Sequence, residues 1–170
     1  MKIRWKLLTL PILIGTCASL LHSSDAPPTA TADKIVIIKS KRELQLFSGP
    51  KLIKTYRVAL GTQPVGAKSC EGDGKTPEGT YRIVSRNAKS AFHKSLRVSY
   101  PNEHDRTKAA AAHCSPGGDI MIHGLPNGYG WIGAGHRAKD WTAGCIALTD
   151  AEIEEIWESV ANGTLVEIRP

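Results

Sequence analysis

The 170-residue chain contains no apolar run long enough to cross a bilayer as a helix, for which ~20 residues are needed. Its main apolar stretch, residues 7–21, has only 15 residues and includes a proline. The chain also lacks internal repeats and heptads, and 41% of its residues are hydrophobic while 22% are charged. Such proportions argue against a polytopic membrane protein, a collagen-like chain and a disordered chain. The length suits one globular domain.

Charge of neither sign is in strong excess. The 22 basic and 16 acidic residues give a formal net charge of +6. Lys2, Arg4 and Lys6 stand at the extreme N-terminus, and beyond residue 24 there are 19 basic and 16 acidic residues, a net charge of +3. This mildly basic character argues against a nucleic-acid partner and is compatible with a substrate that carries carboxylates.

Two further motif classes are absent or incomplete. No His or Cys pair has the tight spacing of H-x-x-x-H or C-x-x-C, so a zinc site is only an alternative. Its possible ligands would be His93, His104, His113, His123, His136 and Cys114. Residues 128–133 spell G-x-G-x-x-G, but no helix is expected over 134–142, as a dinucleotide site requires. The glycines favour a flexible lid instead.

The N-terminus is typical of an export signal. Residues 1–6 are basic, and residues 7–21 resemble the apolar core of a signal peptide. The sequence contains two alternative cleavage motifs for this signal. One is a lipoprotein-like box ending at Cys17, and the other is the Ala-Thr-Ala of residues 30–32. We expect a protein of the periplasm or cell envelope, in contact with a membrane only if the leader is uncleaved or lipidated. The predicted segments are a signal peptide over 1–24, a polar tether over 25–33 and a catalytic domain over 34–170.

Four cysteines are present, and Cys17 lies in the leader. In an oxidising compartment Cys70 and Cys114 are predicted to pair, which leaves Cys145 as the odd thiol. Three unpaired cysteines are the alternative. An unpaired thiol in an exported protein needs a reason, and nucleophilic chemistry is one.

Alternating and β-branched runs predict a mainly β (α+β) domain with a few short helices. Residues 42–47 and 51–60 form a predicted hairpin, and residues 105–113 a short helix. Residues 61–79, rich in Gly, Pro and Lys, are a long loop of the kind that often carries function. Strands are expected over 34–39, 42–47, 51–60, 80–85, 96–100, 119–123, 145–148 and 164–168.

The last helix has the clearest local signal. Thr149 and Glu152 have the spacing of a capping box at its start. Asn162-Gly163 is predicted to end the helix before the closing strand. One apolar stripe faces the core, formed by Ile153, Ile156, Trp157 and Val160.

His123 ends one predicted strand and Cys145 begins another. A thiol is a nucleophile as its thiolate, and a nearby imidazole can take its proton. Gly144 would let a substrate approach the backbone amides, which could hold a developing oxyanion. A small buried thiol and a satisfied core histidine fit the same residues equally well.

Four sequence blocks occur in a characteristic order: the predicted hairpin around residues 44–46, Gly-Asp-Gly-Lys-Thr-Pro-Glu-Gly-Thr-Tyr at 72–81, Ile122-His123-Gly124, and Trp-Thr-Ala-Gly-Cys-Ile at 141–146. With them, residues 34–170 resemble the L,D-transpeptidase catalytic domain family (YkuD type), and within it the YafK-like murein transpeptidase branch. The resemblance covers essentially the whole predicted exported domain.

The resemblance implies a mixed β-sandwich with a few helices, acting on peptidoglycan stem peptides without a metal or organic cofactor. It implies that Cys145 is the nucleophile and His123 its general base, with a backbone carbonyl at Gly124 orienting the imidazole. It further implies that the Gly144 and Cys145 amides form the oxyanion hole. In the expected reaction D-alanine leaves a donor tetrapeptide, a thioester forms, and an amine of a second stem peptide resolves it as a cross-link.

The chain departs from the family pattern at two places. Ala147 stands where many members have an arginine two positions after the cysteine, and the spacing of 22 residues from His123 to Cys145 is longer than usual. Hydrolysis of a wall amide, for example release of a wall-linked lipoprotein, is therefore an alternative to cross-linking. A zinc-dependent peptidase and a non-catalytic wall-binding module are less favoured alternatives.

Four residues between the histidine and the cysteine are predicted to bind substrate. Arg137 would replace the missing arginine as a ligand for a substrate carboxylate. Tyr129 and Trp131 would form a lid that selects water or an amine, and Thr142 would contact the substrate beside the nucleophile.

Overall fold

The structure, a computed structural model, describes Met1 and residues 31–170. The predicted signal peptide beyond Met1, Cys17 and residues 25–30 of the predicted tether lie outside the described residues. The first strand begins at Ala32, two residues before the predicted start of the domain. In the described part of the chain, no helix combines the length and apolar character needed to pass through a membrane.

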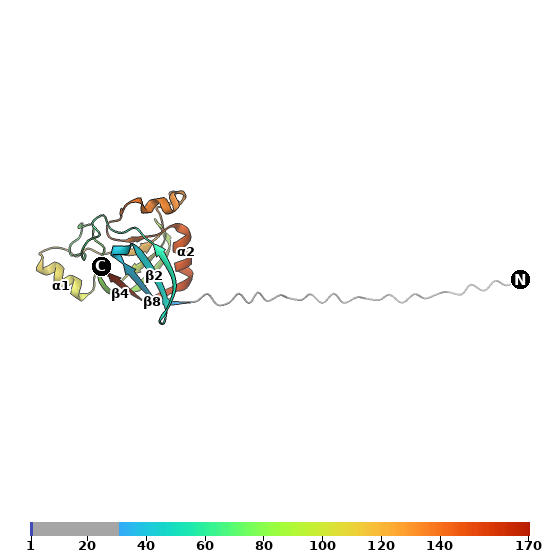
Figure 1. The fold of residues 1–170 in the computed structure, drawn as a ribbon, viewed down its shortest axis with the longest axis horizontal. Coiled ribbons are helices and arrows are strands. Elements are labelled where there is room, and N and C mark those ends of the chain that lie inside the picture. The colour runs from blue at the N-terminus through green and yellow to red at the C-terminus, as the bar shows by residue number, and fades with distance from the viewer. Residues whose placement is uncertain (2–30) are drawn as a thin grey trace.

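Eight strands of the described chain form one mixed sheet in the order β3-β2-β1-β8-β4-β5-β6-β7 (Figure 1). Strands β1 and β8 pair in parallel, as do β6 and β7, and the other neighbours are antiparallel. The predicted mainly β fold is confirmed. The strands are β1 (Ala32–Ile38), β2 (Glu43–Ser48), β3 (Lys51–Arg57), β4 (Gly79–Ser90), β5 (His93–Val98), β6 (Met121–His123), β7 (Ile146–Ala147) and β8 (Val160–Arg169).

The sheet curls until its two ends meet. The segment after β3 bridges to β7 through Ala59 and Ala147, whose backbone groups exchange hydrogen bonds of 3.0 and 2.9 Å. A second bridge joins Gly61 to Thr142. This closure brings the start of the loop that follows β3 beside the segment that precedes β7. It is also the reason that residues far apart in the sequence build one site.

Among the described residues, two α-helices and two 3₁₀ helices accompany the sheet. Helix α1 (Glu103–Ala111) and helix α2 (Asp150–Ser159) lie on opposite sides of the strands in Figure 1, and α2 packs against β5 and β8. The 3₁₀ helices are η1 (Lys39–Lys41) and η2 (Gly130–Ala138). The predicted capping box of α2 is confirmed, because Thr149 accepts from the Glu152 N–H while Glu152 accepts from the Thr149 N–H.

The predicted end of the last helix is wrong. Helix α2 ends at Ser159, and Val160 already has the extended backbone of β8. Asn162-Gly163 lies within β8, where the register with β1 shifts, and Gly163 has a positive φ of 90°. A glycine can end a helix or accommodate an irregularity in a strand. Here the pairing of β8 with β1 makes this segment a strand.

Strand β4 also differs from its prediction, because it continues from 80–85 to Ser90. The added residues are mostly exposed, so their side chains do not show an alternating pattern. Their backbone pairs with β5, including Arg86 with Leu96 and Asn87 with Ser95. Tertiary pairing therefore lengthens a strand that its own side chains do not predict.

Candidate active site

The neighbouring parallel strands β6 and β7 position the predicted histidine and cysteine. Ile122 pairs with Ile146, and both side chains are fully buried in the core. Successive side chains of a strand point to opposite faces. His123 follows Ile122 and Cys145 precedes Ile146, so the side chains of His123 and Cys145 project from the opposite face of the sheet. The fold therefore places both predicted catalytic residues on one face, His123 at the end of β6 and Cys145 directly before β7.

The His123 imidazole has a defined orientation. Its Nδ1 lies 2.7 Å from the Gly124 carbonyl oxygen, and because a carbonyl only accepts, Nδ1 carries the proton. The Nε2 atom is then left with a lone pair. The rings of Phe92 and Trp141 pack on the imidazole with centroid distances of 4.6 and 5.9 Å. Burial lowers the pKa of His123, while the bond to Gly124 acts in the opposite direction, so the side chain is a neutral base at pH 7.

The Cys145 side chain is a half-buried thiol. Its Sγ lies 3.5 Å from the Asp119 carbonyl oxygen, and within residues 31–170 it makes no hydrogen bond to His123. Burial raises the pKa of Cys145, and the Met121 backbone and the Lys68 charge oppose that effect only in part. The resting pair is therefore a neutral thiol and a neutral imidazole rather than a thiolate and an imidazolium.

A tight turn fixes the backbone on either side of Cys145. The Thr142 hydroxyl accepts from the Gly144 N–H at 3.1 Å and donates to the Cys145 carbonyl at 2.8 Å. Gly144 has a φ of 135°, and a Cβ added there would lie 2.6 Å from the Lys75 carbonyl oxygen. Only glycine fits this position without a backbone shift.

This turn differs from two sequence predictions. The Gly144 N–H, expected to bind an oxyanion, is already used by Thr142. The Cys145 N–H has no hydrogen-bond partner among the described residues and is the amide available to a substrate. Thr142, expected to contact substrate, is 5% exposed and holds the turn instead.

The predicted long loop of residues 61–79 supports this turn, and a buried lysine organises the loop. Lys39 is 2% exposed, and its Nζ donates to the carbonyls of Gly66 and Thr76 and to the Glu78 carboxylate at 2.6, 2.9 and 2.8 Å. The Thr76 hydroxyl in turn accepts from the Gly61 N–H at 3.1 Å. Lys39 was not predicted from the sequence, because a lysine at the end of an apolar strand is normally solvated.

The middle of the same loop is held by a carboxylate and a disulfide. The Asp73 carboxylate accepts from the Lys68 ammonium at 2.8 Å and from three backbone N–H groups. Burial alone would raise the pKa of Asp73, but these bonds lower it to about 2. The predicted Cys70–Cys114 disulfide is confirmed, and Cys145 is the free thiol of the described residues.

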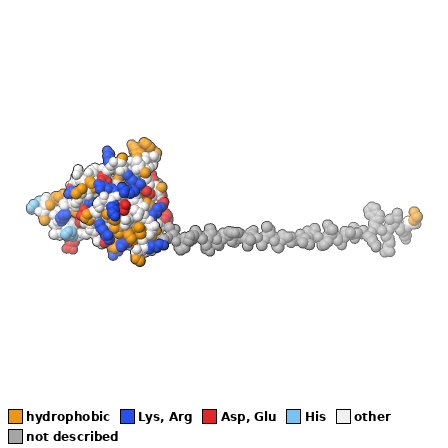
Figure 2. All heavy atoms as spheres, viewed as in Figure 1, with side chains coloured by type: hydrophobic (Ala, Val, Ile, Leu, Met, Phe, Trp, Pro, Cys, Tyr) orange, Lys and Arg blue, Asp and Glu red, His pale blue; other side chains and the backbone are white. Residues whose placement is uncertain are grey.

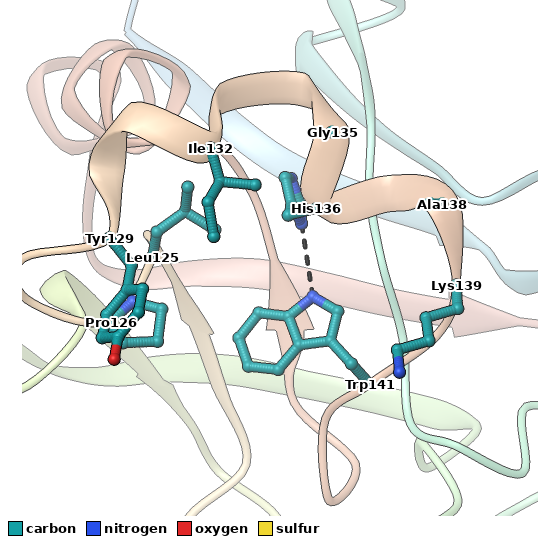
Figure 3. Close-up of a pocket in the computed structure, with 9 residues that line it drawn as sticks. All are labelled: Leu125, Pro126, Tyr129, Ile132, Gly135, His136, Ala138, Lys139 and Trp141. Atoms are coloured by element: carbon teal, nitrogen blue, oxygen red, sulfur yellow. Dashed lines mark hydrogen bonds between the residues drawn. The ribbon is translucent and has the colours of Figure 1, made fainter.

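A cavity of about 380 Å³, lined mainly by apolar side chains, lies on the side of Trp141, the residue that packs on His123 (Figure 3). The Trp141 ring connects the cavity to His123, because it contacts the His123 ring and its Nε1 donates to Nδ1 of His136, a cavity residue, at 3.3 Å. His136 Nδ1 is thus an acceptor, and burial lowers the pKa of His136 to about 4, so this ring is also neutral. The cavity is lined by Leu125, Pro126, Tyr129, Ile132, Gly135, His136, Ala138, Lys139 and Trp141.

The predicted lid is η2, a kinked 3₁₀ segment with Gly133 at the break. It begins inside the glycine motif, at Gly130, and is not the α-helix that a dinucleotide-binding unit places after such a motif. Tyr129 and Ile132 line the cavity, while Trp131 is 82% exposed and does not. Figure 2 shows hydrophobic side chains gathered at the upper edge of the folded part, where η2, orange in Figure 1, projects.

Arg137 does not present its charge to the cavity. Its guanidinium forms an ion pair with Glu152, the acidic residue of the α2 capping box. The side chain is 20% exposed, and it is absent from the cavity lining. The prediction that Arg137 takes the place of the arginine missing at Ala147 stays a prediction, and it requires this ion pair to open.

The histidines that the structure describes are not grouped as a zinc site. Among the residues that the structure describes, no three or more His, Cys, Asp or Glu side chains are grouped to hold a metal ion. Cys114 is in the disulfide, His123 bonds to Gly124, and His93 bonds to Glu154 at 2.7 Å. Each of these groups already has a different partner.

The pKa directions predict how Cys145 reacts with an alkylating reagent. Since burial raises the thiol pKa above its usual 9.0, we expect slow alkylation by iodoacetamide at pH 7 and a steady rise in rate above pH 9. Mass spectrometry of the Cys145 peptide measures the rate at each pH. A rate that is already at its plateau between pH 5 and pH 7 would indicate a thiolate–imidazolium pair and contradict the expectation.

Comparison with known sequences identifies relatives. A sequence model of the L,D-transpeptidase catalytic domain (YkuD) matches residues 32–168. The chain is 30% identical over 142 residues to "Putative L,D-transpeptidase YafK" of Escherichia coli (strain K12), which covers 80% of this chain and 50% of that protein. The chain thus spans about half the length of the curated relatives it matches.

Solved structures share the fold. The helical cell shape determining protein Pgp2 from Campylobacter jejuni has a TM-score of 0.58 and 22% identity, covering 83% of this chain and 50% of that chain. An L,D-transpeptidase from Mycobacterium smegmatis has a TM-score of 0.54 and 13% identity, covering 82% of this chain and 59% of that chain. At these identities the similarity concerns the fold alone.

Proposed function

The chain belongs to the YkuD family of L,D-transpeptidase catalytic domains, and we propose that it transfers an acyl group of a peptidoglycan stem peptide through a thioester on Cys145. The observation that carries the proposal is the pair of adjacent strands that places Cys145 and a neutral, carbonyl-oriented His123 on one face. The stem tetrapeptide is the donor. An exported, periplasmic location remains part of the proposal.

In the first step the Cys145 thiol turns from the Asp119 carbonyl toward His123, and Nε2 takes its proton. The Sγ attacks the carbonyl carbon of the amide that joins the third residue to the terminal D-alanine. The Cys145 N–H donates to the oxygen that becomes negative in the tetrahedral intermediate. The protonated imidazole then gives its proton to the leaving amine, and D-alanine departs as the thioester forms.

In the second step a nucleophile enters and the cycle closes. The neutral imidazole takes a proton from the incoming amine or water, which attacks the thioester carbonyl. Collapse of the second tetrahedral intermediate releases the thiolate, which regains the proton from His123. An amine of another stem peptide gives a cross-link, and water gives a hydrolysed stem. If the donor amide links the stem to a lipoprotein instead of D-alanine, the lipoprotein amine leaves in the first step and water then hydrolyses the thioester. We favour cross-linking as the principal activity.

The experiment incubates the full chain, or its Cys145→Ala variant, with purified stem tetrapeptides and with lipoprotein-linked muropeptides. Mass spectrometry then identifies the products. Peptide dimers that have lost D-alanine and that require Cys145 are the expected result. Cleavage that requires Cys145 but yields no dimers would make the protein a hydrolase of the same fold. Identical products from both proteins would contradict the nucleophile assignment.

A further inference from the structure

Strand β5 carries a cationic side chain onto the face that bears the cysteine. The register of β5 with β6 pairs Leu96 with Ile122 and Arg97 with Met121. Leu96 and Ile122 are both fully buried, so they point to the core. Arg97 and Met121 therefore point to the opposite face, in the row that Cys145 continues.

The spacing of this row suits a peptide substrate. Neighbouring strands lie about 4.8 Å apart, so the backbones of Arg97 and Cys145, two strands apart, are roughly 10 Å from each other. An extended peptide covers about 3.4 Å per residue. A substrate whose reacting amide lies at Cys145 can thus bring a carboxylate a few bonds away within reach of the Arg97 side chain.

The partner of Arg97 ties it to the nucleophile. Its Nη2 lies 3.0 Å from Asp119 Oδ1, and the carbonyl of the same Asp119 lies 3.5 Å from Cys145 Sγ. The two side chains are 49% and 72% exposed. Exposed ion pairs of this kind contribute little to stability, so another carboxylate can replace Asp119 at small cost.

Two of the other basic residues considered above already have partners. Arg137 is paired with Glu152, and Lys68 is buried against Asp73. Position 147 is an alanine. Arg97 combines a solvent-exposed guanidinium, the correct face and a partner of the same chemistry as the substrate group.

We propose that Arg97 is a carboxylate-binding residue of the substrate site, and that a stem-peptide carboxylate displaces Asp119 from it. The inference rests on the proposed function and adds the group that recognises the donor. A guanidinium can bind a carboxylate through two parallel hydrogen bonds, which fixes the direction of the peptide as well as its position.

The test measures binding apart from turnover. Isothermal titration calorimetry of full-length Cys145→Ala protein uses a synthetic stem tetrapeptide and versions in which each carboxylate in turn is a carboxamide. Adding Arg97→Ala should weaken binding of the unmodified peptide by roughly tenfold or more. The Cys145→Ala parent, which keeps Arg97, should bind one of the carboxamide peptides equally weakly. Adding Arg97→Ala should weaken the binding of that peptide no further.

Two further variants separate recognition from general structure. Asp119→Asn should tighten binding of the unmodified peptide, because it removes the competing carboxylate, and asparagine tolerates the positive φ of 54° at this position. Arg169→Ala is the matched control, since Arg169 forms an exposed ion pair with Glu167 on β8, away from β5–β7. This control should bind like the Cys145→Ala parent.

The inference is overturned if Arg97→Ala binds like Arg169→Ala, if every carboxamide peptide still loses affinity on loss of Arg97, or if the tetrapeptide does not bind the parent. Product analysis with Cys145 intact decides the proposed function separately. Cysteine-dependent products with no role for Arg97 would leave the function and reject the inference. Arg97-dependent binding without cysteine-dependent products would support the binding role of Arg97 and reject the proposed function.

Discussion

Replacing Cys145 with alanine is expected to lower the release of D-alanine from a stem tetrapeptide by at least about a thousandfold. The reason is chemical, because without Sγ no atom on this face can form the thioester. The side chain is only half-buried, so the shorter alanine should leave the free energy of unfolding nearly unchanged. Mass spectrometry of released D-alanine and a urea unfolding curve measure the two quantities.

The histidine gives an independent check of the same pair. His123→Ala should lower turnover by at least about a hundredfold, whereas His104→Ala, at an exposed histidine of α1, should have no effect. Since burial lowers the pKa of His123 below its usual 6.5, wild-type turnover should fall on the acid side only below that pH. Full activity of either Cys145→Ala or His123→Ala would refute the mechanism.

The strand positions of the proposed catalytic residues are predicted from the sequence better than their surroundings. Cys145, His123 and Gly124 stand at strand ends, where alternation and resemblance both apply. The partners of Arg137 and the Gly144 amide could not be predicted, because each depends on how a segment packs after folding. The capping box already explained Glu152 from the sequence, so nothing local pointed to its ion pair with Arg137.

Arg97 illustrates a different limit. Its strand was predicted over 96–100, and the alternation of Leu96, Arg97 and Val98 already separates an apolar from a polar face. What the sequence does not contain is the register with β6 and β7, which depends on pairing across long separations. Only the register places Arg97 in the same row as Cys145.

The fold followed the prediction where local signals and packing agree, as at the Thr149 capping box. It departed where they compete. Asn162-Gly163 is a turn signal that β8 accommodates as an irregularity, and the polar end of β4 is a strand only because β5 pairs with it. Closure of the sheet through Ala59 and Ala147 has no local signal at all.

Removing the disulfide is expected to have the largest effect on stability. The bond joins Cys70 in the long loop to Cys114 after α1, across a sequence separation of 44. For a closed loop of this length, the loss of entropy in the unfolded chain stabilises the protein by about 4 kcal/mol. The Cys70→Ser/Cys114→Ser double variant should lose roughly that free energy of unfolding, measured with urea.

The same variant should also have lower turnover, because the loop of residues 61–79 supports the turn that precedes Cys145. The Lys75 carbonyl faces Gly144, and Asp73 ties Lys75 to the segment that contains Cys70. Dithiothreitol should reproduce both effects in the wild-type protein and have no effect on the double variant, which is the matched control. A change in unfolding free energy below about 1 kcal/mol would mean that loop contacts such as Lys68 with Asp73, rather than the covalent bond, hold this segment.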